Sequence, residues 1–422
     1  MHEILIKNTL AVHFHSISEE SPRIALTTRK SAPLLALMAA RCMLECAPQC
    51  ADKKCGKNAL SMVKLLYNRY KSITLIQDFY PFIFKWTFGG VMVGKRRYIS
   101  EFSVGITSKG WLMFTPDQLH AKGKMQKDFQ DIADNSHIYL ICKRPKATFS
   151  NEQPVIQDGL VSGKVISRVD GEEVVSEYSF PFSFQANEVS LKVAPYPHRK
   201  IQTLKSDGSW ERYWPSDMLA FQTGNEIFHN FEVLYVGQAF ADGRRTAIER
   251  LRSHSTLQKI LAETMDEYPD DQVFIFNLVY DDYMLLTSFD GRDKNSIDGD
   301  EDNARLKSII DNHLSKKEVV CLAEAGLIRY FQPKYNEIYR ESFPASDQKI
   351  LSGCFDLDFS GLTVELELSE SPLKLYSERV KLKYHHIAAF NLADEEERLG
   401  FFSLSDGKEV RSIIDDVIKM KR

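Results

Sequence analysis

The sequence lacks an apolar run long enough to cross a lipid bilayer. Its longest apolar stretch extends from Ala32 to Leu44 and is interrupted by Arg41, whereas a membrane-spanning helix needs about 20 apolar residues. The N-terminal segment Met1–Lys7 also lacks the basic start and apolar core of a secretion signal. These absences predict a cytoplasmic protein that does not insert into membranes.

An excess of positive charge is also missing. The 54 lysine and arginine residues are outnumbered by 58 aspartate and glutamate residues, which gives a net charge of −4 and a pI near 6.3. A protein that binds nucleic acid over its whole surface is usually basic, because phosphate neutralisation supplies much of the affinity. Any contact with nucleic acid is therefore expected to be local.

Cysteine is scarce, with seven in 422 residues, and an odd number cannot be paired completely. A cytoplasmic chain of this size has no need of disulfides. Four cysteines gather in one segment and could hold zinc, although no close Cys-x-x-Cys pair is present: Cys42, Cys46, Cys50 and Cys55. Cys42 and Cys46 lie one helical turn apart, so a buried helical stripe is the alternative to a metal site.

The organisation of the chain follows from changes in its apolar pattern, since it has no internal repeat or low-complexity linker. Residues 1–215 begin with helical patterns and turn to short strands, and residues 345–422 are rich in strands with a terminal helix. Residues 217–337 alternate strands and helices, as an α/β unit does. We predict a multidomain α+β or α/β protein with a small sheet and flanking helices in its central module. The flanking strands could also form one β domain into which this module is inserted.

The first half of the central module predicts a strand, two helices and a second strand. Phe231–Gly237 is an apolar strand, and Thr246–His254 has the pattern of a short helix. Ser255 and Gln258 have the spacing of a capping box for the next helix. Val273–Val279 is almost continuously apolar, which predicts a strand that is covered on both faces.

The second half begins with an acidic loop at residues 290–302. Its glycines do not fall where a calcium-binding loop requires them, so we expect a solvated insertion. Ser315 and Glu318 then form a second capping box, and the helix that follows carries Glu324 beside an apolar stripe and ends before Pro333.

Four motifs in this segment resemble the GIY-YIG nuclease family. That family has a Tyr-Ile-Gly strand, a helix with an arginine, a later helix with a glutamate, and a Pro-x-Tyr-Asn motif. The corresponding residues here are Tyr235-Val236-Gly237, Arg250 with His254, Glu324-Ala325-Gly326-Leu327-Ile328 and Pro333-Lys334-Tyr335-Asn336. The resemblance covers residues 217–337 of the 422 and implies a GIY-YIG-like fold for them.

The first motif of the family, Gly-Ile-Tyr, has no counterpart directly before Tyr235. It should end the preceding strand and supply a hydroxyl near the attacking water. No tyrosine lies between Tyr213 and Tyr235, so Phe221 or Phe228 would take this place without offering a hydroxyl.

The resemblance implies metal-dependent cleavage of phosphodiester bonds in DNA, or else in RNA. Glu324 would be the protein ligand of Mg²⁺ or Mn²⁺, and Arg250 would bind the phosphate. Tyr235 would orient water or phosphate, His254 would assist proton transfer in place of the missing tyrosine, and Asn336 would support the geometry by hydrogen bonding. Four arginines and one lysine against one glutamate in residues 243–259 supply local positive charge.

The alternative is a catalytically impaired relative that binds nucleic acid or protein. The missing tyrosine favours this alternative, whereas the joint presence of Arg250, Glu324 and Asn336 favours an enzyme. The residues also have purely structural interpretations: Tyr235 as a strand aromatic, Arg250 as part of a solvated helix face, His254 as a helix cap and Asn336 as a turn cap. The sequence does not predict an oligomeric state.

Overall fold

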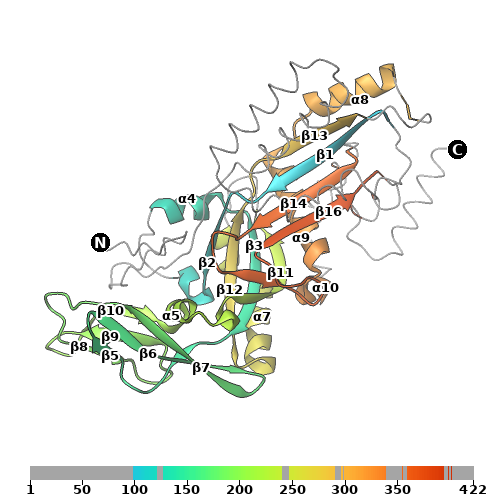
Figure 1. Ribbon diagram of the computed structural model, residues 1–422. Helices are drawn as coiled ribbons and strands as arrows, with labels where there is room; N and C mark the ends of the chain where they lie inside the picture. Colours follow the sequence, from blue (N-terminus) through green and yellow to red (C-terminus); the bar gives the residue numbers. More distant parts are fainter. Residues whose placement is uncertain are drawn as a thin grey trace, which may run out of the picture. The chain divides into compact units, whose positions relative to one another are not determined.

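The computed structural model describes residues 98–120, 127–239, 247–289, 299–338 and 359–393 together with residues 296, 297, 354, 398 and 401 (Figure 1). The cysteine cluster, the predicted N-terminal helices, most of the acidic loop and the predicted C-terminal helix lie outside these residues. Helices and strands are both abundant in the described part, which is α+β. The chain forms two compact units: one comprises residues 1–28, 102–288 and 305–422, and the other residues 29–101 and 289–304. None of the helices in the described ranges has the length and apolarity to cross a membrane.

A central five-stranded sheet in the larger unit has the order β15-β11-β3-β12-β2. Strand β3 is antiparallel to both β11 and β12, while β15 is parallel to β11. Residues 217–337 supply only β11 and β12, so the sheet also draws on sequence from both sides of that segment. The bounds are Gly110–Phe114 for β2, Ile138–Pro145 for β3, Asn230–Gln238 for β11, Asp271–Val279 for β12 and Lys374–Tyr376 for β15.

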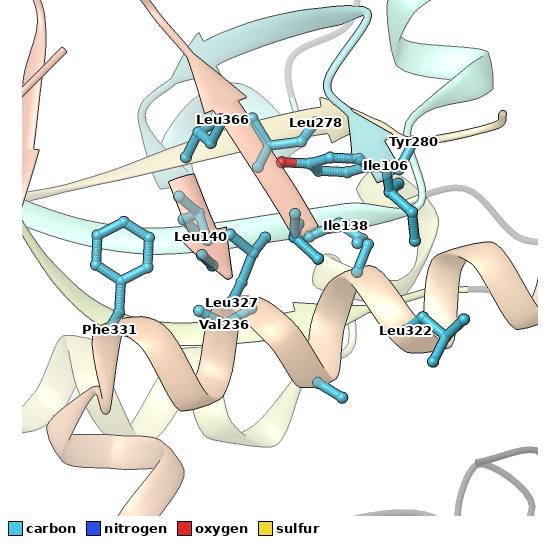
Figure 2. Close-up of a cluster of buried hydrophobic side chains, with 14 of the residues drawn as sticks. Ile106, Ile138, Leu140, Val236, Leu278, Tyr280, Leu322, Leu327, Phe331 and Leu366 are labelled. Atoms are coloured by element: carbon cyan, nitrogen blue, oxygen red, sulfur yellow. The ribbon is translucent and has the colours of Figure 1, made fainter. Parts of the chain in front are cut away.

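Both faces of this sheet are buried. Side chains of β3 alternate between two apolar clusters, with Ile138 and Leu140 on one face and Tyr139 and Ile141 on the other. The first face packs on helix α9, Lys316–Phe331 (Figure 2). The second is covered by α4, α6 and α7, which span Lys127–Asn135, Ala247–Leu251 and Ser255–Glu267. The prediction that Val273–Val279 is a strand covered on both faces is therefore confirmed.

A second sheet has the order β13-β1-β14-β16. Its strands span Ser100–Thr107 (β1), Met284–Phe289 (β13), Gly361–Glu367 (β14) and His385–Asn391 (β16). Leu362, Val364 and Leu366 alternate along β14 and are fully buried. Helix α9 packs closely on β14, since a Cβ atom at Gly326 would lie 2.6 Å from Cγ2 of Val364. Helix α8, Asp300–Asp311, begins with the last acidic residues of the predicted loop, and their carboxylates suit a helix N-terminus.

A β unit is inserted between β3 and β11. It has its own apolar core, which includes Phe149, Phe180 and Trp214. One alternative from the sequence was an α/β module inserted into a β domain. The structure has the opposite arrangement, because a β unit is inserted between two strands of the central sheet. The strands are β4 to β7 at Thr148–Phe149, Val155–Gln157, Leu160–Val169 and Glu172–Pro181, and β8 to β10 at Ser190–Val193, Lys200–Leu204 and Trp210–Pro215.

Short helices lead from the inserted β unit back to the central sheet. They are α5, η2 and η3, at Ser216–Ala220, Phe221–Thr223 and Glu226–Phe228. The buried guanidinium of Arg144 lies 4.7–5.5 Å from the ring centres of four phenylalanines: Phe221, Phe228, Phe231 and Phe274. Burial lowers the pKa of Arg144 to about 10, so it stays charged at neutral pH. Its contacts join the inserted unit to the sheet.

Candidate active site

A β-bulge in β11 determines where Tyr235 points. Val233 pairs with Cys142 of β3, but Tyr235 pairs with the next residue, Ile141, so Leu234 is an extra residue. Leu234 and Tyr235 consequently lie in the same apolar cluster, on the face of the sheet opposite α9. Bulges of this kind redirect side chains and are common beside active sites.

A second tyrosine, Tyr139, lies beside Tyr235. It pairs with Gly237 across the β3–β11 ladder, and the rings of Tyr139 and Tyr235 are 6.2 Å apart and stacked at 30°. A Cβ atom at Gly237 would come within 2.6 Å of Cζ and Oη of Tyr139. Glycine is therefore required at position 237 to leave room for the Tyr139 ring.

Tyr139 is a residue that the sequence analysis missed. We expected a phenylalanine, Phe221 or Phe228, in the place beside Tyr235, but both pack around Arg144 instead. The sequence contained a signal, since His137-Ile138-Tyr139 shares its last two residues with Gly-Ile-Tyr. The inserted β unit separates this signal from Tyr235 in the sequence.

The short helix α6 carries Arg250, and His254 lies directly before helix α7. The predicted helix Thr246–His254 proved too long at its C-terminal end: α6 ends at Leu251, and His254 is the N-cap of α7. Its Nδ1 accepts a hydrogen bond of 3.2 Å from the backbone N–H of Leu257. The predicted capping box at Ser255 was wrong. The His254 imidazole accepts from the N–H of Leu257 and so caps α7 one residue earlier. The interpretation of His254 as a helix cap is confirmed.

The capping contact determines the tautomer of His254. Since Nδ1 accepts a hydrogen bond, the proton of the neutral ring resides on Nε2. Nε2 lies 3.1 Å from Oη of Tyr139 and donates to it. Burial, helped by the charge of Arg250, lowers the pKa of His254 to about 4, so the ring is neutral at neutral pH.

Arg250, Glu324 and the two tyrosines share one electrostatic environment. Burial raises the pKa of Tyr139 and of Tyr235, Glu324 raises both further, and Arg250 acts in the opposite direction. Arg250 also hydrogen-bonds Tyr139, and its pKa is raised because the two phenols and Glu324 outweigh the effect of burial. The structure thus brings together Tyr235, Arg250, His254 and Glu324, the first four predicted site residues.

Glu324 belongs to α9, and its charge acts on both tyrosines and on Arg250. The predicted capping box of Ser315 and Glu318 is present at the start of that helix. One turn before Glu324, Cys321 contacts the side chain of Gln238 at the end of β11, with a distance of 3.5 Å from Nε2 to Sγ. Residues three apart share a helix face, so Glu324 lies on the side of α9 that meets β11. Its side chain is buried, with 5% exposed.

Asn336 supports the strand that carries Tyr235. It belongs to α10, Lys334–Ile338, which follows the predicted helix break at Pro333. Its Oδ1 accepts from the N–H of Val236 at 2.7 Å, and its Nδ2 donates to the carbonyl of Val236 at 2.9 Å. The amide thus replaces a strand partner and holds the backbone between Tyr235 and Gly237.

Within the described ranges, no three or more histidine, cysteine, aspartate or glutamate side chains group so that they could enclose a metal ion. The donor set still fits Mg²⁺, which keeps several waters and often binds one protein carboxylate together with substrate phosphate. Comparisons with protein-family models, with curated proteins and with solved structures found no match. The functional interpretation therefore depends on the geometry and chemistry of the site residues alone.

Proposed function

We propose that this chain is a GIY-YIG-like, metal-dependent endonuclease in which His137-Ile138-Tyr139 stands in place of the first motif. The observation that supports it most is the position of Tyr139. Its hydroxyl accepts from His254, its ring stacks beside Tyr235, and it hydrogen-bonds Arg250. A tyrosine hydroxyl at this place is what the first motif of the family supplies.

The two donors on Tyr139 define what its hydroxyl can do. His254 and Arg250 both direct N–H groups at the oxygen, which leaves the phenolic proton to bind water or a phosphate oxygen. Donors to the oxygen also favour the phenolate, whereas burial disfavours it. Tyr139 is thus suited to orient the attacking water, with Tyr235 beside it.

Arg250 and Glu324 supply the charges that phosphodiester cleavage needs. The planar guanidinium offers several donors to phosphate oxygens. Glu324 would hold Mg²⁺ or Mn²⁺, whose charge would stabilise the phosphate and the leaving oxygen. Because the chain as a whole is acidic, the cluster of arginines around Arg250 would make the local contact with DNA, the favoured substrate, or with RNA.

Cleavage assays test the proposal. Plasmid DNA and single-stranded DNA and RNA would be incubated with the protein and Mg²⁺ or Mn²⁺, beside Glu324→Ala and the matched surface variant Asp266→Ala. We expect Glu324→Ala to lose about 10²–10³ in rate and Asp266→Ala, an exposed residue of α7, to keep full activity. Cleavage that persists in Glu324→Ala would contradict the proposal.

A catalytically impaired binding protein is the second candidate, favoured by the burial of the cluster. Tyr139 is fully buried, and Glu324 is 5% exposed. In that case the wild-type protein would bind nucleic acid without cleaving it, and Arg250→Ala would abolish the binding.

A further inference from the structure

The inserted β unit contains a three-stranded sheet, β10-β9-β8, with two different faces. Leu191, Ile201 and Trp214 point inward and are buried in the core of the unit. Residues that alternate with them point outward, and Lys192, Gln202 and Tyr213 form one row across the three strands. The outer face, as named here, consists of Lys192, Lys200, Gln202, Leu204, Trp210 and Tyr213.

Aromatic rings and lysines lie together on the outer face. Nζ of Lys200 is 4.4 Å from the ring centre of Tyr213, and the rings of Trp210 and Tyr213 meet edge to face at 5.6 Å. Lys192 and Lys200 are exposed. Neither has a carboxylate partner in the part of the chain that the structure describes, whereas Lys205, in the turn after β9, pairs with Glu211.

Tyr196 stands at the turn that joins β8 to β9. The turn is held by hydrogen bonds from the N–H of His198 to the carbonyl of Pro195, at 3.1 Å, and from the N–H of Phe149 to the carbonyl of His198, at 2.8 Å. Despite this fixed backbone, the side chain of Tyr196 is 87% exposed. The Tyr196 ring meets that of His198 edge to face at 6.0 Å, and its exposed face at this end of the sheet is available for stacking.

We infer that the outer face and Tyr196 bind a single-stranded segment of nucleic acid, with bases stacked on Tyr196 and Trp210 and phosphates paired with Lys192 and Lys200. Stacking on aromatic rings combined with lysine–phosphate contacts is how sheets bind single strands. The positive charge is local to Lys192 and Lys200, and the one carboxylate that acts on the Tyr213 phenol of this face, among the described residues, is Asp117. This inference rests on the proposed function, for which it supplies the substrate class.

The position of the unit in the chain connects this binding to the site. The inserted β unit leaves the sheet from β3 and returns to it through β11, and these strands carry Tyr139 and Tyr235. A strand bound on the outer face would therefore be held by the same compact unit as the candidate active site.

Binding would be measured by fluorescence anisotropy with labelled oligothymidylate, oligouridylate and a DNA duplex, in EDTA so that no cleavage occurs. We expect Tyr196→Ala to weaken single-strand binding about tenfold and Tyr196→Trp to retain it. The matched control is Tyr384→Ala, because Tyr384 is also exposed, at 44%, but lies outside the inserted unit. Its affinity should equal that of the wild type.

The contribution of Lys192 and Lys200 is tested separately, by the salt dependence of binding. Because each phosphate contact to a single strand contributes about 0.7 to the slope of log affinity against log salt, the double variant Lys192→Gln, Lys200→Gln should reduce that slope by about 1.4. Unchanged affinity in Tyr196→Ala together with an unchanged salt slope would overturn the inference. So would self-association of the protein that Tyr196→Ala abolishes, since the outer face would then join two copies of the chain.

The Glu324→Ala variant separates this inference from the proposed function. If it binds single strands like the wild type but does not cleave, both stand. If the wild type cleaves and Tyr196→Ala binds and cleaves equally well, the inference fails and the nuclease remains. If no cleavage occurs but single-strand binding depends on Tyr196, the binding face stands without the enzyme.

Discussion

Nε2 of His254 lies 3.1 Å from the hydroxyl of Tyr139, although the two residues are 115 positions apart in the chain. The same imidazole caps α7 through Nδ1. One neutral ring thus serves two purposes: it stabilises a helix start, and it donates a hydrogen bond to the phenol at the centre of the candidate site. The two purposes can be separated by substitution.

His254→Ala should lower both stability and cleavage. Loss of a side-chain cap costs about 1 kcal/mol, and Tyr139 also loses the hydrogen bond from His254. His254→Asn should restore the cap, because asparagine is among the best N-cap residues, but its shorter side chain cannot reach Tyr139. We expect the urea midpoint of His254→Asn to return toward that of the wild type while cleavage stays low. Full activity in His254→Asn would show that the contact with Tyr139 is dispensable.

Tyr139→Phe should remove cleavage and leave the fold intact. The ring still fills its place over Gly237, but Nε2–H of His254 loses its acceptor, which costs about 1–3 kcal/mol of stability. The rate of cleavage should fall by about 10² or more. Tyr178→Phe is the matched control, because Tyr178 is a buried tyrosine in the core of the inserted β unit. Equal activity of the two variants would remove Tyr139 from the mechanism.

Acidification should destabilise the protein through His254 and His386. Burial lowers the pKa of each from the ordinary 6.5 to about 4. Between these values the unfolded chain binds a proton that the folded protein does not, so stability falls as the pH is lowered from 6.5 to 4. Above 6.5 both states are neutral, and the full stability is present.

The measurement is the urea midpoint at several pH values. His254→Asn should show a smaller loss of stability on acidification than the wild type, whereas a substitution of His120, which is exposed, should leave the loss unchanged. If the wild type and His254→Asn lost equal stability on acidification, the lowered pKa of His254 would be contradicted.

Asn277 should be replaceable by leucine with a gain in stability. It lies in the centre of β12 and is fully buried, and neither polar atom of its amide has a hydrogen-bond partner among the described residues. A buried amide without a partner costs about 1–3 kcal/mol, so Asn277→Leu should raise the free energy of unfolding. Asn336→Leu is the matched opposite, because the amide of Asn336 makes two hydrogen bonds to Val236 and its loss should lower stability. A lower urea midpoint for Asn277→Leu would mean that its amide is satisfied in solution.

Sequence patterns predicted the local structure well wherever the signal was itself local. The capping box of Ser315 and Glu318 and the buried strand at Val273–Val279 each depend on residues within one element. The cap of α7 was predicted at Ser255 because Ser255 and Gln258 have the spacing of a capping box. The structure uses His254 instead, whose ring is also held by the distant Tyr139.

Strand pairing was the part that local patterns could not supply. Alternation shows which residues of a strand share a face, but it does not name the neighbouring strand. Tyr139 and Tyr235 come together only because β3 and β11 pair across the inserted β unit. The bulge at Leu234, which turns Tyr235 to the site face, likewise depends on the partner strand.

Topologically, the inserted β unit takes the place of a hairpin turn, because β3 and β11 are adjacent and antiparallel. Turns tolerate lengthening better than any other part of a sheet, since the ladder on either side is unchanged. The inserted β unit can therefore vary in length and sequence without a change in the β3–β11 ladder that carries Tyr139 and Tyr235. The contacts of Arg144 limit this variation. Any replacement of the inserted β unit would have to keep Phe221 and Phe228, whose rings pack on the Arg144 guanidinium.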